Sequence, residues 1–277
     1  MNTCVQLDPY FRTYLKKLLD TYTGPCLDEL PEGSPHHLFA QALEQLQKRE
    51  HQPGTLELLS EAAEHGHAHA AYCIGILLVL VSQGEDLDLL NEAETWLEYA
   101  ADLGLEEAMI ALGFFYLAED CPLRNDGQSA QAFRRAAEAG NVEGFYEYGC
   151  CFLSGRGVEQ DFVQAAEWLQ RGADADDTMS QFELGVQYSL GEGVEKDDSI
   201  AISLFEKAAA KGHPGSMAAM ADYYYEGEGV EQDFAQAFQL YYQCYQHGNP
   251  KGNIGLSRFF LDGEIVAIDV QTALQLL

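Results

Sequence analysis

Hydrophobic residues recur along most of the chain at steps of three and four residues, which is the spacing of one face of an α-helix. Residues 177–212 show this pattern twice, first around Leu184 and then at Ile200, Ala201, Leu204, Phe205, Ala208 and Ala209. Between the two runs, Gly191 is placed to end a helix, and Asp197 or Asp198 is placed to cap the start of the next one. This stretch therefore predicts a helical hairpin.

The hairpin pattern repeats along the chain with a period of 36 residues. We call the small residue at the centre of each first helix the pivot; the pivots are Gly113, Gly149, Gly185, Ala221 and Ser257. Three columns keep the same step after the pivots: Gly155, Gly191, Gly227 and Gly263; Asp161, Asp197, Asp233 and Asp269; Ala165, Ala201, Ala237 and Ala273. A fixed period of this length indicates a repeat array, in which each unit packs on its neighbours.

The pivot glycines are interpreted as packing sites. A glycine inside a helix costs about 1 kcal/mol relative to alanine, so its recurrence at Gly113, Gly149 and Gly185 needs a compensating role. We expect the second helix of each hairpin to cross the first at this point and to leave no space for a Cβ atom.

The full pattern is Ala-x-x-x-Leu-Gly-x-x-Tyr-x-x-Gly-x-Gly-Val, followed by Asp and then by Ala-x-x-Trp/Leu-Phe/Leu. It resembles the Sel-one-like repeat family, which is related to the tetratricopeptide repeats. The best matches run over 148–169, 184–205 and 220–241, and the resemblance covers about residues 55–277. It implies an all-α, right-handed α/α superhelical solenoid of about seven helical hairpins.

Three regions are expected along the chain. Residues 1–35 hold an N-terminal capping helix, with Tyr14 and Leu18 on one face, and a connector; we expect this helix to cover the open end of the stack. Residues 36–66 form a degenerate first hairpin, and residues 67–277 form the repeat array with an incomplete last unit. Either the sequence stops inside that unit at Leu277, or its uncapped C-terminal end contacts another molecule.

The chain is strongly acidic, with 45 acidic and 15 basic residues and a formal net charge of −30. Such a surface repels nucleic acid and anionic lipid, so neither is an expected partner. It attracts a basic protein and accelerates encounter with it. The alternative is that the acidity serves solubility alone.

Compartment signals favour a cytoplasmic protein. The seven cysteines share no repeat column and form no metal-binding spacing, so we expect reduced thiols. The first residues contain no apolar signal core, and the longest apolar run, 74–81, is too short to span a bilayer.

Candidate chemistry is sparse, and we expect neither an enzyme nor a cofactor. The three Gly-x-Gly-Val loops follow helices, and two carry a central glutamate, so they are read as helix stops instead of phosphate-binding loops. His65, His67 and His69 are the nearest approach to a metal cluster, but a full ligand set is missing, so no metal is expected. A metal-dependent protein that uses these histidines stays an alternative.

The surface formed by successive first helices is the expected binding site, because the resemblance implies that these helices line a concave wall. The columns two before and two after the pivot lie four residues apart and share one helical face. With their neighbours they give the expected partner-binding set: Phe114, Phe115, Glu147, Cys151, Glu183, Gln187, Asp222, Tyr223, Tyr225, Arg258 and Phe259. We expect its aromatic residues to be anchors around the carboxylates of Glu147 and Glu183; the alternative is that several of them pack between units.

These features predict a non-enzymatic protein-binding solenoid. The resemblance implies bacterial interaction adaptors, some of which are immunity proteins paired with secreted toxins. The acidity favours an immunity or inhibitor protein that neutralises a basic toxin. The alternative is a regulatory adaptor or scaffold that binds a peptide or signalling partner in the groove.

Overall fold

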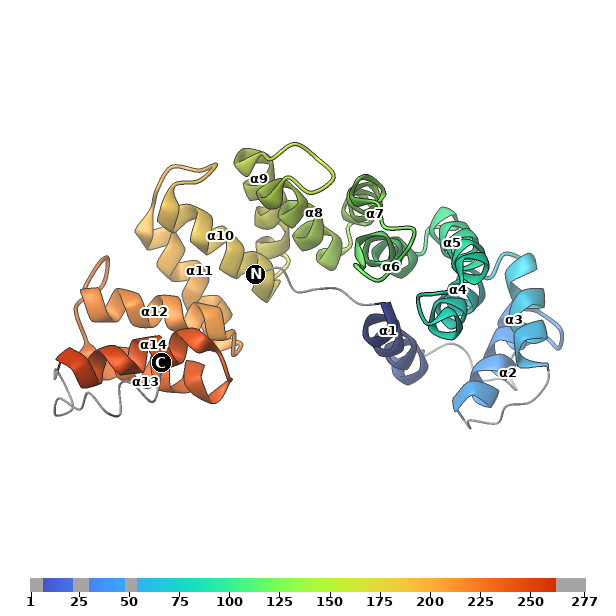
Figure 1. The fold of residues 1–277 in the computed structure, drawn as a ribbon, viewed down its shortest axis with the longest axis horizontal. Helices are drawn as coiled ribbons and strands as arrows, with labels where there is room; N and C mark the ends of the chain where they lie inside the picture. The colour runs from blue at the N-terminus through green and yellow to red at the C-terminus, as the bar shows by residue number, and fades with distance from the viewer. Residues whose placement is uncertain (1–6, 22–29, 48–53, 263–277) are drawn as a thin grey trace. The chain divides into compact units, whose positions relative to one another are not determined.

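The computed structural model describes residues 7–21, 30–47 and 54–262, and all regular secondary structure in these ranges is helical (Figure 1). The helices are α1 (Leu7–Thr21), α2 (Pro35–Gln47), α3 (Thr55–Glu64), α4 (Ala68–Ser82), α5 (Leu87–Asp102), α6 (Glu106–Leu117), α7 (Asp126–Ala139), α8 (Val142–Ser154), α9 (Phe162–Asp174), α10 (Thr178–Leu190), α11 (Asp198–Ala210), α12 (Pro214–Glu226), α13 (Phe234–Gln246) and α14 (Pro250–Asp262).

The chain divides into two compact units, Met1–Gly144 with Arg156–Val158 and Phe145–Gly155 with Glu159–Leu277. In the first unit, α3 packs on α2 and α4, and α5 packs on α4 and α6. In the second unit, each helix from α9 to α14 likewise packs on the next along the chain. The predicted all-α solenoid of helical hairpins is therefore confirmed.

The pivot glycines lie where the two helices of a hairpin cross, as predicted. A Cβ atom built on Gly113 would lie 2.3 Å from the Phe133 ring. The equivalent atom on Gly185 would lie 2.7 Å from the Phe205 ring, and that on Gly149 would lie 3.0 Å from Leu169. The close approach explains why only small residues occupy the column.

The turn inside each hairpin is fixed by a second repeated contact. The Asp side chains at positions 161, 197 and 233 accept hydrogen bonds from backbone N–H groups in the first turn of the second helix, so all three are N-caps. Their own N–H groups donate to the carbonyl nine residues earlier. These pairs are Asp161 with Phe152, Asp197 with Tyr188 and Asp233 with Tyr224, at 2.9 to 3.1 Å.

The Gly-x-Gly-Val loops end the first helices, as predicted. Gly191 and Gly227 are the left-handed C-caps of α10 and α12. The second glycine of the loop has a further role: Gly193 has a φ of +73°, and a Cβ atom there would lie 2.1 Å from the carbonyl oxygen of Phe162. The loop therefore packs directly against the start of the preceding second helix.

Departures from the repeat have visible structural effects. Gly75 is the pivot of α4 and lies 38 residues before Gly113, two more than the repeat step. The extra two residues lengthen the first helix, since α4 has 15 residues where α10 and α12 have 13. The degenerate first hairpin is present as α2 and α3. In the last unit, α14 is described, but Gly263, Asp269, Ala273 and the expectation about Leu277 lie outside the described residues.

The N-terminal helix is present as α1, but its position differs from the open end of the stack. It packs along α4 and also contacts α6, so it covers the first helices of its unit (Figure 1). Phe11 is fully buried, and Tyr14 and Leu18 are half-buried. The apolar side of α1 packs on α4 and α6. The periodicity of the sequence predicts that such a side exists but not which helices cover it.

The crossing contacts predict an ordered series of stabilities. Gly113→Ala should destabilise by about 1 to 3 kcal/mol, because the added methyl overlaps a buried phenylalanine ring. Gly149→Ala should be close to neutral, because Leu169 yields by a few tenths of an ångström and alanine gains about 1 kcal/mol of helix propensity. Urea unfolding followed by circular dichroism checks the order. Equal midpoints for the two variants would contradict the crossing as the cause of the small column.

Candidate functional site

Six of the eleven expected partner-binding residues are buried and cannot present their side chains to a partner. They are Phe114, Phe115, Cys151, Gln187, Tyr225 and Phe259, each no more than 9% exposed. This corrects the expectation that the aromatic members are surface anchors. Of that aromatic group, Tyr223 is the one left half-buried, and its hydroxyl donates to Asp198 at 2.9 Å.

These residues are buried because a first helix packs on two sides. The ring of Phe114 packs against Phe133 of its own hairpin with centroids 5.1 Å apart. The ring of Tyr225 contacts Phe234 in its own hairpin and Phe259 in the next one. Gln187 donates from its amide to the carbonyl of Phe162 in the preceding hairpin at 3.0 Å. In the column two after the pivot, Phe115, Cys151, Gln187 and Phe259 are buried and Tyr223 is half-buried.

Two columns of the first helices in the second unit, those two before and one after the pivot, are called the first-helix row. In this row Glu147, Cys150, Glu183, Val186, Ala219, Asp222 and Arg258 are half-buried or exposed, and Gly255 is buried. Four of the expected partner-binding residues, Glu147, Glu183, Asp222 and Arg258, lie in it. These four residues are therefore accessible, and their role in binding a partner stays a prediction.

Glu147 and Glu183 lie close enough to act on the same neighbours. Burial raises the pKa of Tyr146 and of Cys150, and the charges of both glutamates raise these pKa values further. Burial also raises the pKa of Glu183 itself. The two carboxylates therefore form a negative patch on α8 and α10 that is partly shielded from water.

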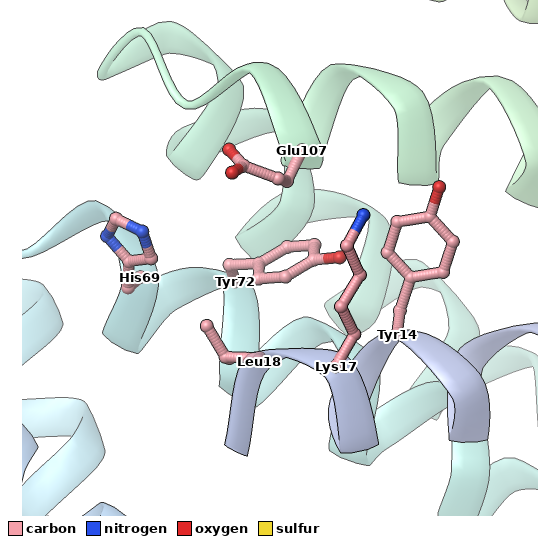
Figure 2. A pocket seen from close by; sticks show the side chains of 6 residues that line it. All are labelled: Tyr14, Lys17, Leu18, His69, Tyr72 and Glu107. Atoms are coloured by element: carbon pink, nitrogen blue, oxygen red, sulfur yellow. The ribbon is translucent and has the colours of Figure 1, made fainter. Parts of the chain in front are cut away.

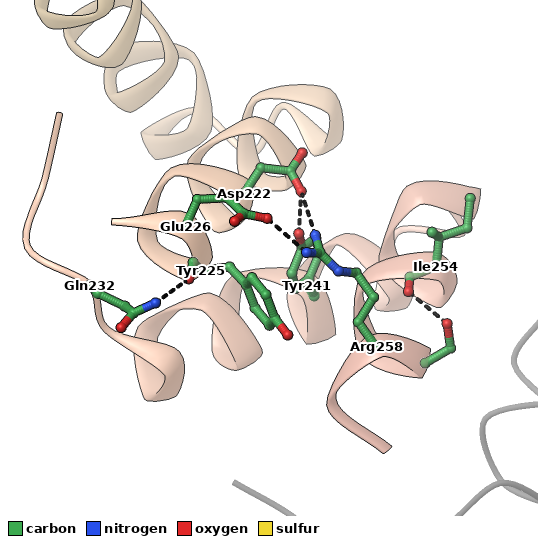
Figure 3. A network of polar contacts seen from close by, with 8 residues as sticks. Asp222, Tyr225, Glu226, Gln232, Tyr241, Ile254 and Arg258 are labelled. Atoms are coloured by element: carbon green, nitrogen blue, oxygen red, sulfur yellow. Dashed lines mark hydrogen bonds and ion pairs between the residues drawn. The ribbon is translucent and has the colours of Figure 1, made fainter. Parts of the chain in front are cut away.

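At the other end of the row, carboxylates are paired with an arginine (Figure 3). The Arg258 guanidinium bonds Glu226 at 2.7 Å, lies 3.9 Å from Asp222 and stacks 4.1 Å from the centroid of the Tyr225 ring. Tyr241 donates its hydroxyl hydrogen to Asp222. A cavity of about 250 Å³ beside this network is lined by Asp222, Tyr241, Lys251, Ile254, Gly255 and Arg258. This end of the row carries both positive and negative side chains, so it does not match a partner surface that is uniformly basic.

The first unit has a different arrangement, because α1 lies on its first helices. Tyr14, Lys17 and Leu18 of α1 face His69 and Tyr72 of α4 and Glu107 of α6 across a cavity of about 50 Å³ (Figure 2). The Tyr14 hydroxyl donates to Glu143 at 2.7 Å. Sequence reasoning missed this contact. A signal was available in the three basic residues of α1, Arg12, Lys16 and Lys17, within so acidic a chain.

The histidines have a structural role. The Nδ1 atom of His67 accepts a hydrogen bond from the N–H of Ala70 and caps α4, as His213 caps α12. His36 and Phe39 pack on the His67 ring, with centroids 4.7 and 4.3 Å away. Burial, followed by the charges of His36 and His69, lowers the pKa of His67 to about 4. Within the ranges that the structure covers, no group of three His, Cys, Asp or Glu side chains is arranged to hold a metal ion.

Two other expectations concern the cysteines and membrane-spanning helices. Cys73, Cys121, Cys150, Cys151 and Cys244 are free thiols, while Cys4 and Cys26 lie outside the described residues. None of the helices among the described residues is long and apolar enough to cross a membrane.

Four stretches of the chain match the Sel1 repeat: residues 106–141, 145–177, 178–213 and 214–249. Together they cover just over half of the sequence. The chain belongs to the Sel1 repeat family. Residues 30–95 also match a family of plant tetratrico peptide repeats, and a search of curated proteins gives no significant match.

Solved Sel1-type structures share the fold. A protective antigen present in uropathogenic Escherichia coli strains, which displays an SLR fold, aligns with 91% of this chain at a TM-score of 0.76 and 29% identity. The chain spans 55% of the length of that protein. A Sel1 repeat protein from Oxalobacter formigenes aligns over 100% of this chain and 89% of its own, at a TM-score of 0.74 and 21% identity. This Sel1 repeat chain thus has the architecture of a protein-interaction scaffold.

His67 predicts a pH dependence of stability. Between pH of about 6.5 and 4 the unfolded state takes up a proton at this residue and the folded state does not, so the free energy of unfolding should fall by about 1 to 3 kcal/mol as the pH drops. His67→Asn should remove this component and keep the cap, since Asn141 accepts the equivalent bond at α8. Urea unfolding at pH 7 and 4.5 measures it, with the exposed His247→Asn as control. An unchanged pH dependence in His67→Asn would contradict the assignment.

The buried tyrosines predict opposite effects of hydroxyl removal. Tyr72 is 2% exposed, and no described protein group bonds its hydroxyl, so Tyr72→Phe should raise the free energy of unfolding by about 1 kcal/mol. Tyr116 is equally buried, but its hydroxyl donates to Glu94 at 2.6 Å, so Tyr116→Phe should lower the free energy by about 1 kcal/mol. Thermal unfolding of the two variants compares them. A loss of stability in Tyr72→Phe would show that its hydroxyl is satisfied.

Proposed function

We propose that this Sel1 repeat protein is a non-enzymatic scaffold that binds a basic protein partner along the first-helix row. The observation that carries the proposal is the Glu147 and Glu183 patch, which two successive repeats place on the accessible side of their first helices. The patch is partly desolvated, so an approaching cation meets less screening than it would at a fully exposed carboxylate. The net charge of −30 adds long-range attraction for a basic protein.

The specific form that we propose is a bacterial immunity or inhibitor protein that acts in the cytoplasm and neutralises a basic toxin. Such a partner must be captured quickly, and electrostatic attraction raises the rate of encounter more than it raises affinity. The similarity to repeat proteins from Escherichia coli and Oxalobacter formigenes supports a bacterial setting.

A second candidate is a regulatory adaptor that binds a peptide or signalling partner. The observation that favours it is the cavity at α12 and α14, where Arg258 and Lys251 stand beside Asp222. A segment that carries both signs of charge fits this end of the row better than a uniformly basic surface does. A basic toxin gene or a signalling gene in the neighbouring reading frame distinguishes the two forms.

The proposed patch is tested by charge reversal. Affinity purification with the full chain identifies the bound protein, and Glu147→Lys with Glu183→Lys should then weaken that complex by about tenfold or more, equivalent to 1.4 kcal/mol. The matched control is Glu167→Lys with Glu206→Lys, which changes the net charge equally but on the exposed sides of α9 and α11. Titrations at about 50 and 500 mM salt should show weaker binding at high salt. Equal effects of the two double variants would place the partner elsewhere.

A further inference from the structure

The helix α1 packs on α4 and α6, and we call the surface that it covers the seat. The seat has the composition of a binding site for a helix. In α4 and α6 the columns that form the first-helix row hold Cys73 and Ile76, and Ala111 and Phe114. These four residues are apolar and buried, whereas the same columns of the second unit include the accessible charged residues Glu147, Glu183, Asp222 and Arg258. The helix α1 packs on the two first helices that carry them. The two units therefore differ at these columns, which are apolar and buried in α4 and α6 and carry accessible charges in the second unit.

The contacts of α1 define what the seat accepts. Phe11 is fully buried and supplies an aromatic anchor. Tyr14 supplies both a ring and a hydrogen bond to Glu143, and Lys17 lies on the same cavity as Glu107 (Figure 2). An apolar strip with carboxylates beside it matches an amphipathic helix that carries aromatic and basic residues.

One buried polar atom beside α1 lacks a hydrogen bond within the described part of the chain. The hydroxyl of Tyr72 lines the cavity between α1 and α4, is buried, and has no hydrogen-bond partner among the described protein groups. A buried polar group without a protein partner weakens the complex that buries it. A helix that places a polar side chain at this point would bind the seat better than α1 does.

We infer that the seat on α4 and α6 is a docking site for an amphipathic helix of a partner protein, with aromatic anchors and lysine or arginine beside them, and that α1 occupies it in competition. This inference rests on the proposed function, because it assigns the basic partner a helix and a place in the first unit. The helix α1 then acts as an internal competitor. The partner helix can bind only the molecules in which α1 is undocked, so its apparent affinity for the seat falls in proportion to that fraction.

The experiment uses a fluorescent synthetic peptide of residues 7–21 as the probe and the full chain as the receptor. Phe11→Ser in the full chain removes the buried anchor of the internal helix, so this variant should bind the wild-type peptide at least about tenfold more tightly than the native chain does. A milder variant, Tyr14→Phe in the full chain, keeps the ring, removes the hydroxyl that bonds Glu143 and should give a smaller gain in the same direction. Fluorescence anisotropy measures binding, and circular dichroism confirms that helicity is kept.

Two controls locate the binding. Glu107→Lys and Glu143→Lys, added to the Phe11→Ser chain, should abolish the gain, because both alter the rim of the seat and neither side chain is buried. A peptide with Arg12, Lys16 and Lys17 replaced by glutamate should not bind. If Phe11→Ser and Tyr14→Phe bind the peptide no better than the native chain, or if the rim changes have no effect, the seat is not a helix-docking site. A native chain that dimerises with exchange of α1 would also overturn the inference.

The outcomes separate this inference from the proposed function. If the captured basic partner is sensitive to Glu147 and Glu183 but not to Glu107 and Glu143, the proposed function holds and the seat inference fails. If the Phe11→Ser chain binds the peptide while no basic protein binds the native chain, the seat is a helix-docking site and the proposed function fails. Sensitivity to the rim residues together with improved binding in Phe11→Ser supports both.

Discussion

Each hairpin is organised around a point where its two helices approach too closely for an ordinary side chain to fit between them. At Gly113 and Gly185 the aromatic ring of the second helix lies directly on the backbone of the first. That contact fixes which side of the first helix faces the second helix of its own hairpin. Packing on the neighbouring hairpins then decides which of the remaining columns are buried.

The sequence predicts the repeat closely because small residues, caps and helix stops are local signals. The pivots, the Asp N-caps and the C-cap glycines all lie where their spacing places them. Helix rotation is harder to predict, because it depends on two neighbouring hairpins. Thus Cys151 and Gln187 lie one helical turn from the accessible Glu147 and Glu183, yet both are buried. The position of α1 was not predictable either, because periodicity shows that a helix has an apolar side but not which surface covers it.

The two units differ in the polarity of the columns two before and one after the pivot. In the second unit the row carries the acids Glu147 and Glu183, and near α14 Arg258 pairs with Glu226. In the first unit the corresponding residues are apolar, and α1, which carries the three basic residues Arg12, Lys16 and Lys17, packs on the helices that hold them. A single repeat can thus present an electrostatic or a hydrophobic surface by changing two columns, while the crossing and the caps stay constant.

The hydrogen bond from the N-cap residue to the carbonyl nine positions earlier has a wider consequence. It is present between Asn125 and Tyr116 at 2.8 Å, even though the segment between them has no Gly-x-Gly-Val loop. Closure of the hairpin therefore does not require a Gly-x-Gly-Val turn. Residues 119–123 reach the same end point with a buried Cys121 in the turn, so one closing bond can serve repeats whose connecting segments differ in sequence and packing.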